Sequence, residues 1–306
     1  MNSKISKGDT ALLSHIAEYK LLTIKQLSAL TQRTLQVVRR RLRHLENNQV
    51  IIRKVRGFGS GRGRRENIVV ITQKGLELLR HKEILSEHAK YITDKTTEFI
   101  CIDHDILVNW TFLHLIQIAR HNPQIAIQHF TTSSHDLKMG NADNPLIQER
   151  FTKDDRCKGP LTMVPDGVFT ISYKEKTILF FLEVDMGTET LASFKHEPGD
   201  IRQKIINYQS IFRSAHYKRY EKIFNAKING FRLLFLANTF SRMKKICDLV
   251  QQMPPSDFIW ITDQNQMFSR GISAEIWTRG GRNHNPPESI LGTKLAFKSP
   301  VMDKIR

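Results

Sequence analysis

The sequence predicts a mixed α+β or α/β protein with two domains, an N-terminal winged helix-turn-helix and a mixed β-sheet flanked by helices. Three observations lead to this fold class. A basic first quarter combines three helical patterns with a hairpin pattern, apolar and amphipathic runs alternate further on, and 306 residues suffice for two cores. The expected boundaries are residues 1–82 for the winged helix-turn-helix, 83–97 for a connecting helix, 98–280 for the sheet domain and 281–306 for a loosely ordered tail.

Three helical patterns follow one another in the first 50 residues. Apolar residues recur at spacings of three and four over residues 9–20, with Asp9 as the candidate N-cap, and a short helix is expected after Thr23. The third pattern covers residues 34–48. Its apolar positions form one stripe, and most of its arginines lie on the other faces. Helix, short helix, turn and basic helix together indicate a helix-turn-helix.

A β-rich pair of segments follows the third helix. Residues 50–56 and 66–72 flank GFGSGRGRR, a stretch with four glycines and three arginines, and residues 72–79 return to a helical pattern. The pair is typical of the hairpin, or wing, of a winged helix.

The charge of the chain lies mainly in this first domain. Residues 1–82 hold 18 basic and 5 acidic side chains, whereas the rest of the chain holds 29 and 25. A winged helix places its third helix in the major groove of double-stranded DNA, and its wing contacts the backbone or the minor groove. The candidate DNA contacts are Thr34, Gln36, Arg39, Arg40 and Arg43 on the helix, and Arg62, Arg64 and Arg65 on the wing. The alternatives are that these arginines only solvate the surface, or that the domain docks a protein.

The second domain begins with an amphipathic helix over residues 103–120 and a strand over residues 124–132. The polar segment 133–158 is predicted to be a long loop. A hairpin, a helix, a strand, a second helix and a further strand are then expected, at residues 167–185, 200–217, 230–239, 241–253 and 257–263 respectively. This order predicts a mixed sheet with helices packed against it.

Three carboxylates are placed at one end of the predicted hairpin. Asp166 precedes its first strand, while Glu183 and Asp185 end the second and share one face because side chains alternate along a strand. Crowded carboxylates repel one another unless a cation lies between them, and Mg²⁺ or Mn²⁺ suits such oxygen ligands. The sequence therefore predicts a metal site formed by Asp166, Glu183 and Asp185.

The order of these residues resembles the PD-(D/E)xK nuclease fold, in which an acidic pair holds Mg²⁺ and a lysine orients the attacking group. With the winged-helix pattern before them, PDGVF, FFLEVDMGTET and KIINY make the chain resemble the replication-relaxation proteins of bacterial plasmids and integrative elements. The resemblance covers roughly residues 8–280. It implies a role in replication, nicking or relaxation of a mobile element, with replication or mobilisation proteins as partners.

One departure from the nuclease pattern leaves two functions open. Asp185 stands where that pattern has lysine. In one interpretation the lysine has moved to the next helix, where Lys204 and Tyr208 share a face and join the catalytic set, so that the protein is a Mg²⁺-dependent nickase. In the other the domain does not cut, and the protein is a transcription or replication regulator with a nuclease-like scaffold. Glu189, and Asp105 on the preceding helix, are each either a further ligand or an ordinary polar residue.

Composition also bears on location and assembly. The chain has no signal-peptide pattern and no run of about 18 apolar residues, so we expect a cytoplasmic protein with no membrane association. Its three cysteines are far apart, which disfavours disulfides and a zinc site. A palindromic DNA target would require a homodimer, but no dimer interface can be identified in the sequence.

Overall fold

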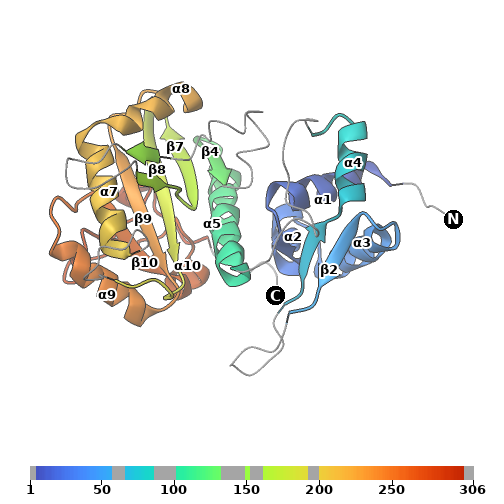
Figure 1. The fold of residues 1–306 in the computed structure, drawn as a ribbon. Helices are drawn as coiled ribbons and strands as arrows, with labels where there is room; N and C mark the ends of the chain where they lie inside the picture. Colours follow the sequence, from blue (N-terminus) through green and yellow to red (C-terminus); the bar gives the residue numbers. More distant parts are fainter. Residues whose placement is uncertain are drawn as a thin grey trace. The chain divides into compact units, whose positions relative to one another are not determined.

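The computed structural model describes residues 5–56, 66–85, 101–131, 149–151, 161–191 and 200–299 (Figure 1). Contacts divide the chain into two units, the first formed chiefly by Met1–Leu113 and the second chiefly by His114–Phe130 and Ile147–Val301. The predicted α+β class is confirmed, with a three-stranded antiparallel sheet in the first unit and a six-stranded mixed sheet in the second. No helix of the described ranges is long and apolar enough to cross a membrane.

The helices of the first unit begin at side-chain caps that the sequence supplies. Thr23 caps the second helix as predicted, and its hydroxyl accepts a hydrogen bond from the Gln26 backbone N–H at 3.2 Å. The first helix starts earlier than predicted. Its N-cap is Ser6, and Asp9 is instead the capping-box partner in the first turn. Within the described residues, the helices that lie entirely in the first unit are α1 (Lys7–Glu18), α2 (Ile24–Thr31), α3 (Leu35–Asn47) and α4 (Gln73–His81).

A small antiparallel sheet completes the first unit, with β3 (Ile68–Ile71) between β1 (Leu22–Thr23) and β2 (Ile51–Lys54). All four residues of β3 are buried, as expected of the central strand. Helix-turn-helix followed by a β2–β3 pair is compatible with a winged helix. The predicted wing tip lies between the described segments 5–56 and 66–85.

Helix α5 (Ile102–His121) contains the boundary between the two units, which falls after Leu113. Hydrogen bonds explain why its first half belongs to the first unit. The Gln26 side chain donates to the Ile106 carbonyl at 2.8 Å, and the Asn109 side chain donates to the Leu21 carbonyl at 2.7 Å. Of the predicted connecting helix, residues 86–97 lie outside the described ranges.

The sheet of the second unit has the order β11-β10-β9-β8-β7-β4. Strand β8 pairs with β7 antiparallel and with β9 parallel, so β8 is covered by a neighbour on each side. Its apolar run from Leu179 to Leu182 is fully buried. The strands are β4 (Ile125–Thr131), β7 (Gly167–Tyr173), β8 (Lys176–Asp185), β9 (Phe231–Ala237), β10 (Ile259–Asp263) and β11 (Thr278–Arg279).

Helices cover both faces of this sheet. Figure 1 shows α7 (Ile201–Arg213) and α9 (Phe240–Gln251) on one face, and α5 and α10 (Gln264–Arg270) on the other. Phe181 of β8 packs against Tyr208 of α7, with ring centroids 5.5 Å apart. The end of α7 leads into the short helices η1 (His216–Arg219) and α8 (Tyr220–Phe224).

Two segments differ from the expectation of irregular structure. Within the predicted loop, β5 (Glu149–Phe151) pairs antiparallel with β6 (Leu161–Met163), and residues 132–148 and 152–160 lie outside the described ranges. Within the predicted tail, residues 281–299 pack onto the second unit and contain the short helix η2 (Thr293–Leu295). Ile290 is buried, and the Ser289 hydroxyl donates to the Ser273 carbonyl at 2.6 Å. These contacts are non-local, so the composition of the tail does not reveal them.

Candidate functional site

Helix α3 presents one polar face to solvent. Its apolar stripe of Val38, Leu42 and Leu45 is completely buried in the first unit. We define the α3 surface as the side chains that this packing leaves exposed and that were predicted to contact DNA. They are Thr34, Gln36, Arg39, Arg40 and Arg43. The helical spacing of the buried stripe therefore brings Gln36, Arg39, Arg40 and Arg43 to one accessible side, and Thr34 is the exposed N-cap of the helix.

Arg41 differs from the other arginines of α3. Its guanidinium donates to the Asp9 carboxylate of α1 at 2.7 Å and also to the Ser6 hydroxyl. The Asp9 side chain is 1% exposed, so Arg41 supplies the counter-charge of a buried carboxylate. Arg39, Arg40 and Arg43, by contrast, form no ion pair with any residue of the described segments.

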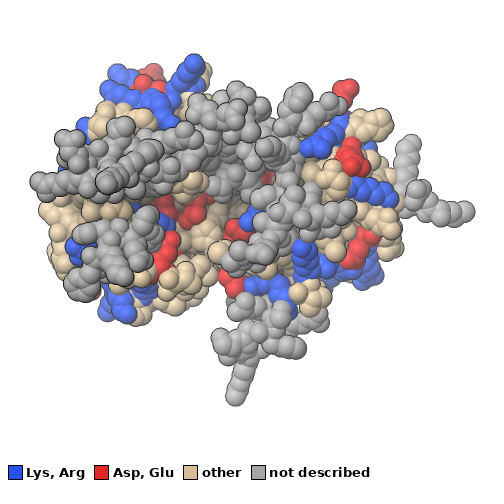
Figure 2. Space-filling view, viewed as in Figure 1, with Lys and Arg blue, Asp and Glu red and all other residues tan. Residues whose placement is uncertain are grey.

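The α3 surface is concave as well as basic. Gln36, Val37, Arg40 and Arg43 line a shallow hollow of about 330 Å³. In the space-filling view, Lys and Arg side chains lie over α3 and β2, with acidic side chains among them (Figure 2). The predicted wing contacts Arg62, Arg64 and Arg65 lie outside the described residues, so the surface is defined by α3 alone.

In the second unit, the β7–β8 hairpin brings Asp166 and Glu183 together. The Asp166 N–H donates to the Leu182 carbonyl at 3.0 Å, and the Val184 N–H donates to the Asp166 carboxylate at 2.7 Å. Gly167, the first residue of β7, pairs with Leu182, so Asp166 lies just before the paired strand and beside the end of β8. Its charge acts on Glu183, so the two carboxylates are close together.

Helix α7 adds a lysine and a tyrosine to this carboxylate pair. The Lys204 ammonium donates to Glu183 at 3.0 Å and to Glu189 at 2.8 Å, and the Tyr208 hydroxyl donates to Glu183 at 2.6 Å. Lys204 and Tyr208 are four residues apart and therefore lie on one side of α7. The structure thus places a helix lysine beside the acidic strand end, where the strand itself has no lysine.

Burial sets the electrostatics of this group. It raises the pKa of Glu183 to about 7, and the charge of Asp166 acts in the same direction, against Lys204 and Tyr208. Burial would lower the pKa of Lys204, but the charges of Glu183 and Glu189 outweigh it and raise that pKa. Lys204 is therefore a permanent cation, whereas Glu183 changes charge near neutral pH.

Asp185 has a different environment from Glu183. Both of its carboxylate oxygens accept from the Arg242 guanidinium of α9, at 2.6 and 3.0 Å. Arg242 also donates to the Glu189 carbonyl at 2.6 Å, so it joins the end of β8 to the segment that follows. The bidentate pair holds Asp185 as a structural anion. Arg242 was not among the predicted site residues. It lies at the start of α9, the helix that follows β9, and the parallel pairing of β9 with β8 brings it to the end of β8.

The donor set fits a metal ion only in part. Within the described segments no three His, Cys, Asp or Glu side chains are grouped to hold an ion, so the predicted three-carboxylate site is not assembled. The pair Asp166 and Glu183 remains. Mg²⁺ commonly takes one or two carboxylates and completes its shell with water and substrate phosphate, so this pair fits the ion whereas Asp185 does not join it.

A family model described as replication-relaxation matches residues 13–226. No curated protein and no solved structure matches the chain. The matched segment includes the α3 surface and, in the second unit, Asp166, Glu183 and Lys204.

Proposed function

Because the chain belongs to the replication-relaxation family, which indicates a role in replication or relaxation of mobile elements, we propose that it binds double-stranded DNA through the α3 surface. The observation that carries this proposal is the exposure of five polar side chains on a helix whose opposite face is fully buried. Three of them are arginines without ion-pair partners in the described segments. Such arginines can contact phosphates and base edges in a major groove.

The proposal is tested by DNA binding of a charge-neutral variant. We expect Arg40→Gln/Arg43→Gln to weaken binding of the full chain to a fluorescent DNA duplex by roughly 30-fold or more, because each arginine contact contributes about 1–3 kcal/mol. Arg213→Gln, which removes an exposed charge from the end of α7, is the matched control and should retain affinity. Equal affinities of the parent and the double variant in anisotropy titrations would contradict the assignment.

A second function is supported by a separate observation, the contact of Lys204 with Glu183 beside Asp166. We propose that this group supports Mg²⁺-dependent nicking of the bound DNA. Asp166 and Glu183 would hold the ion, which when bound polarises a phosphodiester and activates water. Lys204 and Tyr208 orient the Glu183 carboxylate through hydrogen bonds to its two oxygens. Asp185 has no part in this proposal because both of its carboxylate oxygens accept hydrogen bonds from Arg242.

Nicking is tested on supercoiled plasmid with Mg²⁺ or Mn²⁺. We expect Asp166→Asn and Glu183→Gln each to lower the rate at least about 100-fold, while Asp257→Asn, at an exposed carboxylate, leaves it unchanged. Undiminished cutting by either site variant would remove the second function. If the parent binds duplex DNA but cuts it with neither metal, the protein is a DNA-binding replication or transcription regulator.

A further inference from the structure

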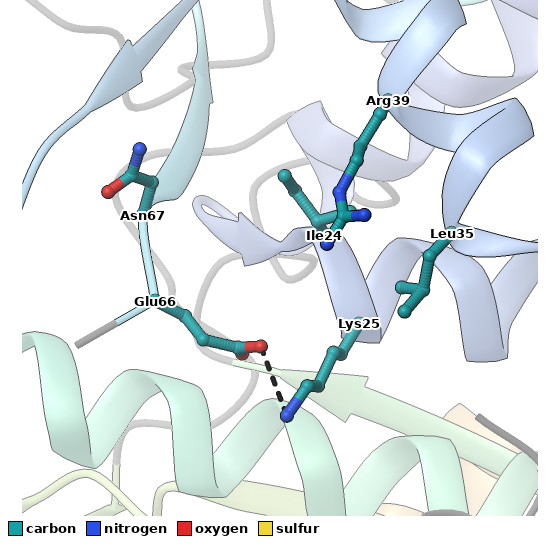
Figure 3. Close-up of a pocket in the computed structure, with 6 residues that line it drawn as sticks. All are labelled: Ile24, Lys25, Leu35, Arg39, Glu66 and Asn67. Atoms are coloured by element: carbon teal, nitrogen blue, oxygen red, sulfur yellow. Dashed lines mark ion pairs between the residues drawn. The ribbon is translucent and has the colours of Figure 1, made fainter. Parts of the chain in front are cut away.

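A second hollow of about 250 Å³ lies beside the α3 surface, where three elements of the first unit meet. It is lined by the start of α2, the exposed side of α3 and the residues that lead into β3. The lining residues are Ile24, Lys25, Leu35, Arg39, Glu66 and Asn67. Figure 3 shows Arg39 reaching from α3 toward the start of α2, with Lys25 and Glu66 directed toward each other.

An ion pair occupies this hollow. The Lys25 ammonium lies 3.3 Å from a Glu66 carboxylate oxygen, and the two side chains are 40% and 39% exposed. A pair this open to solvent contributes little to stability, so its partners can exchange readily. Glu66 lines the same hollow as Arg39, which we assign to the DNA-binding α3 surface. A carboxylate at a DNA-binding surface opposes a polyanion.

The chemistry of the hollow matches one group of the proposed ligand. Lys25 and Arg39 offer cationic donors, Asn67 offers an amide, and about 250 Å³ exceeds the roughly 30 Å³ share of a single water several-fold. A phosphodiester oxygen pair carries one negative charge and accepts hydrogen bonds from such donors. Ile24 and Leu35 contribute apolar sides to the hollow.

We propose that this hollow binds one backbone phosphate of the DNA that lies along α3, and that Glu66 competes with that phosphate for Lys25. The inference rests on the proposed DNA binding and adds to it a phosphate site and an internal competitor. In the free protein Lys25 is paired with Glu66. On binding, the phosphate takes the place of the carboxylate, so Glu66 lowers the affinity for every DNA sequence alike.

Two substitutions in this ion pair should change the DNA affinity in opposite directions. Glu66→Gln should tighten duplex binding by about threefold or more and leave one more cation available to phosphate, whereas Lys25→Gln should weaken binding and reduce the salt slope by about one. The gain in affinity from Glu66→Gln should be smaller in the Lys25→Gln background, because Glu66 and the phosphate then no longer compete for the Lys25 ammonium. Both side chains are well exposed, so all three variants should keep the parental melting temperature.

Matched controls separate a local effect from a change in net charge. Glu77→Gln and Lys82→Gln remove the same charges from the exposed side and end of α4. Affinities of the full chain for one duplex would be measured for all six proteins over a range of salt concentrations. The inference is supported if Glu66→Gln raises the duplex affinity more than Glu77→Gln does and Lys25→Gln lowers it more than Lys82→Gln does. The double variant must also differ from the sum of its two single changes. It is overturned if each pair of variants behaves alike or if the two sites act independently.

This experiment also distinguishes the inference from its premise. If the parent binds duplex DNA and Arg40→Gln/Arg43→Gln does not, while Lys25 and Glu66 variants match their controls, the phosphate site is wrong and the α3 surface stands. If the parent itself does not bind duplex DNA, the premise fails and the inference fails with it.

Discussion

Glu183 is a buried carboxylate whose charge depends on its neighbours. Tyr208 and Lys204 each donate to one of its oxygens, and Asp166 places a second negative charge nearby. Hydrogen bonds and one cation offset only part of the cost of burying the charge, so its pKa rises from 4.5 to about 7. The folded protein therefore holds a proton on Glu183 over a pH range in which the unfolded chain has released it.

This shift makes stability depend on pH. A raised carboxyl pKa contributes stability that is present below pH 4.5 and is lost as the pH rises toward 7. Relative to Glu183→Gln, which cannot ionise, we expect the parent to lose up to roughly 3 kcal/mol between pH 4.5 and 7.5. Urea denaturation at both pH values measures the difference. A pH-independent difference between the two proteins, or one of opposite sign, would show that Glu183 ionises normally.

The partners of Glu183 could be predicted from the sequence, whereas the partner of Asp185 could not. A hairpin paired in register was expected to bring Asp166 near the face of Glu183, and helical spacing offered Lys204 as one of two explanations for the missing lysine. The partner of Asp185 could not be found in this way. Arg242 lies 57 residues further along the chain, and only the parallel pairing of β8 with β9 brings its helix to this site.

Among the elements, helix α3 has two faces with different roles. One face is buried in the first unit, and we propose that the other binds DNA. The buried stripe of α3 packs inside the first unit and the Arg41–Asp9 ion pair joins α3 to α1, whereas Arg39, Arg40 and Arg43 extend into solvent. Neighbouring arginines in one run thus have separate roles, because successive residues of a helix point in directions about 100° apart.

The separation of roles gives a paired prediction. Arg41→Gln leaves the Asp9 carboxylate buried without its cation, so we expect it to destabilise the first unit by about 2–3 kcal/mol. Its DNA affinity at a temperature where it is folded should stay close to that of the parent. Arg40→Gln should show the reverse, weaker binding at unchanged melting temperature. Thermal unfolding and anisotropy on the same samples distinguish the two. If Arg41→Gln loses as much affinity as Arg40→Gln while melting normally, the division of α3 into two faces is incorrect.

Element boundaries were predictable where a local signal exists. The threonine cap of α2, the hairpin of β7 and β8 and the alternation of helices and strands from α7 to β10 all follow from sequence patterns. Two features had no local signal. Residues 281–299 look irregular but are held by distant contacts such as Ser289 with Ser273, and α5 has a single periodic pattern although its two halves belong to different units.

At the level of the whole molecule, the charge distribution and the family membership both support the proposed polyanionic partner. Residues 1–82 carry most of the net charge of +17, and the replication-relaxation match spans both units. We therefore interpret the first unit as the part that binds DNA and the second as the part that acts on it or regulates that action. The two carboxylates in the second unit add little negative charge, and Lys204 partly neutralises them. The positive charge of the chain therefore stays concentrated in the first unit.

We propose that arginines of the α3 surface neutralise phosphates of double-stranded DNA. The salt dependence of duplex affinity, compared between the parent and Arg40→Gln/Arg43→Gln, is the direct test. Each lost phosphate contact should lower the slope of log affinity against log salt by about one, so we expect the two slopes to differ by about two. Parallel lines for the two proteins, with Arg213→Gln indistinguishable from both, would contradict it.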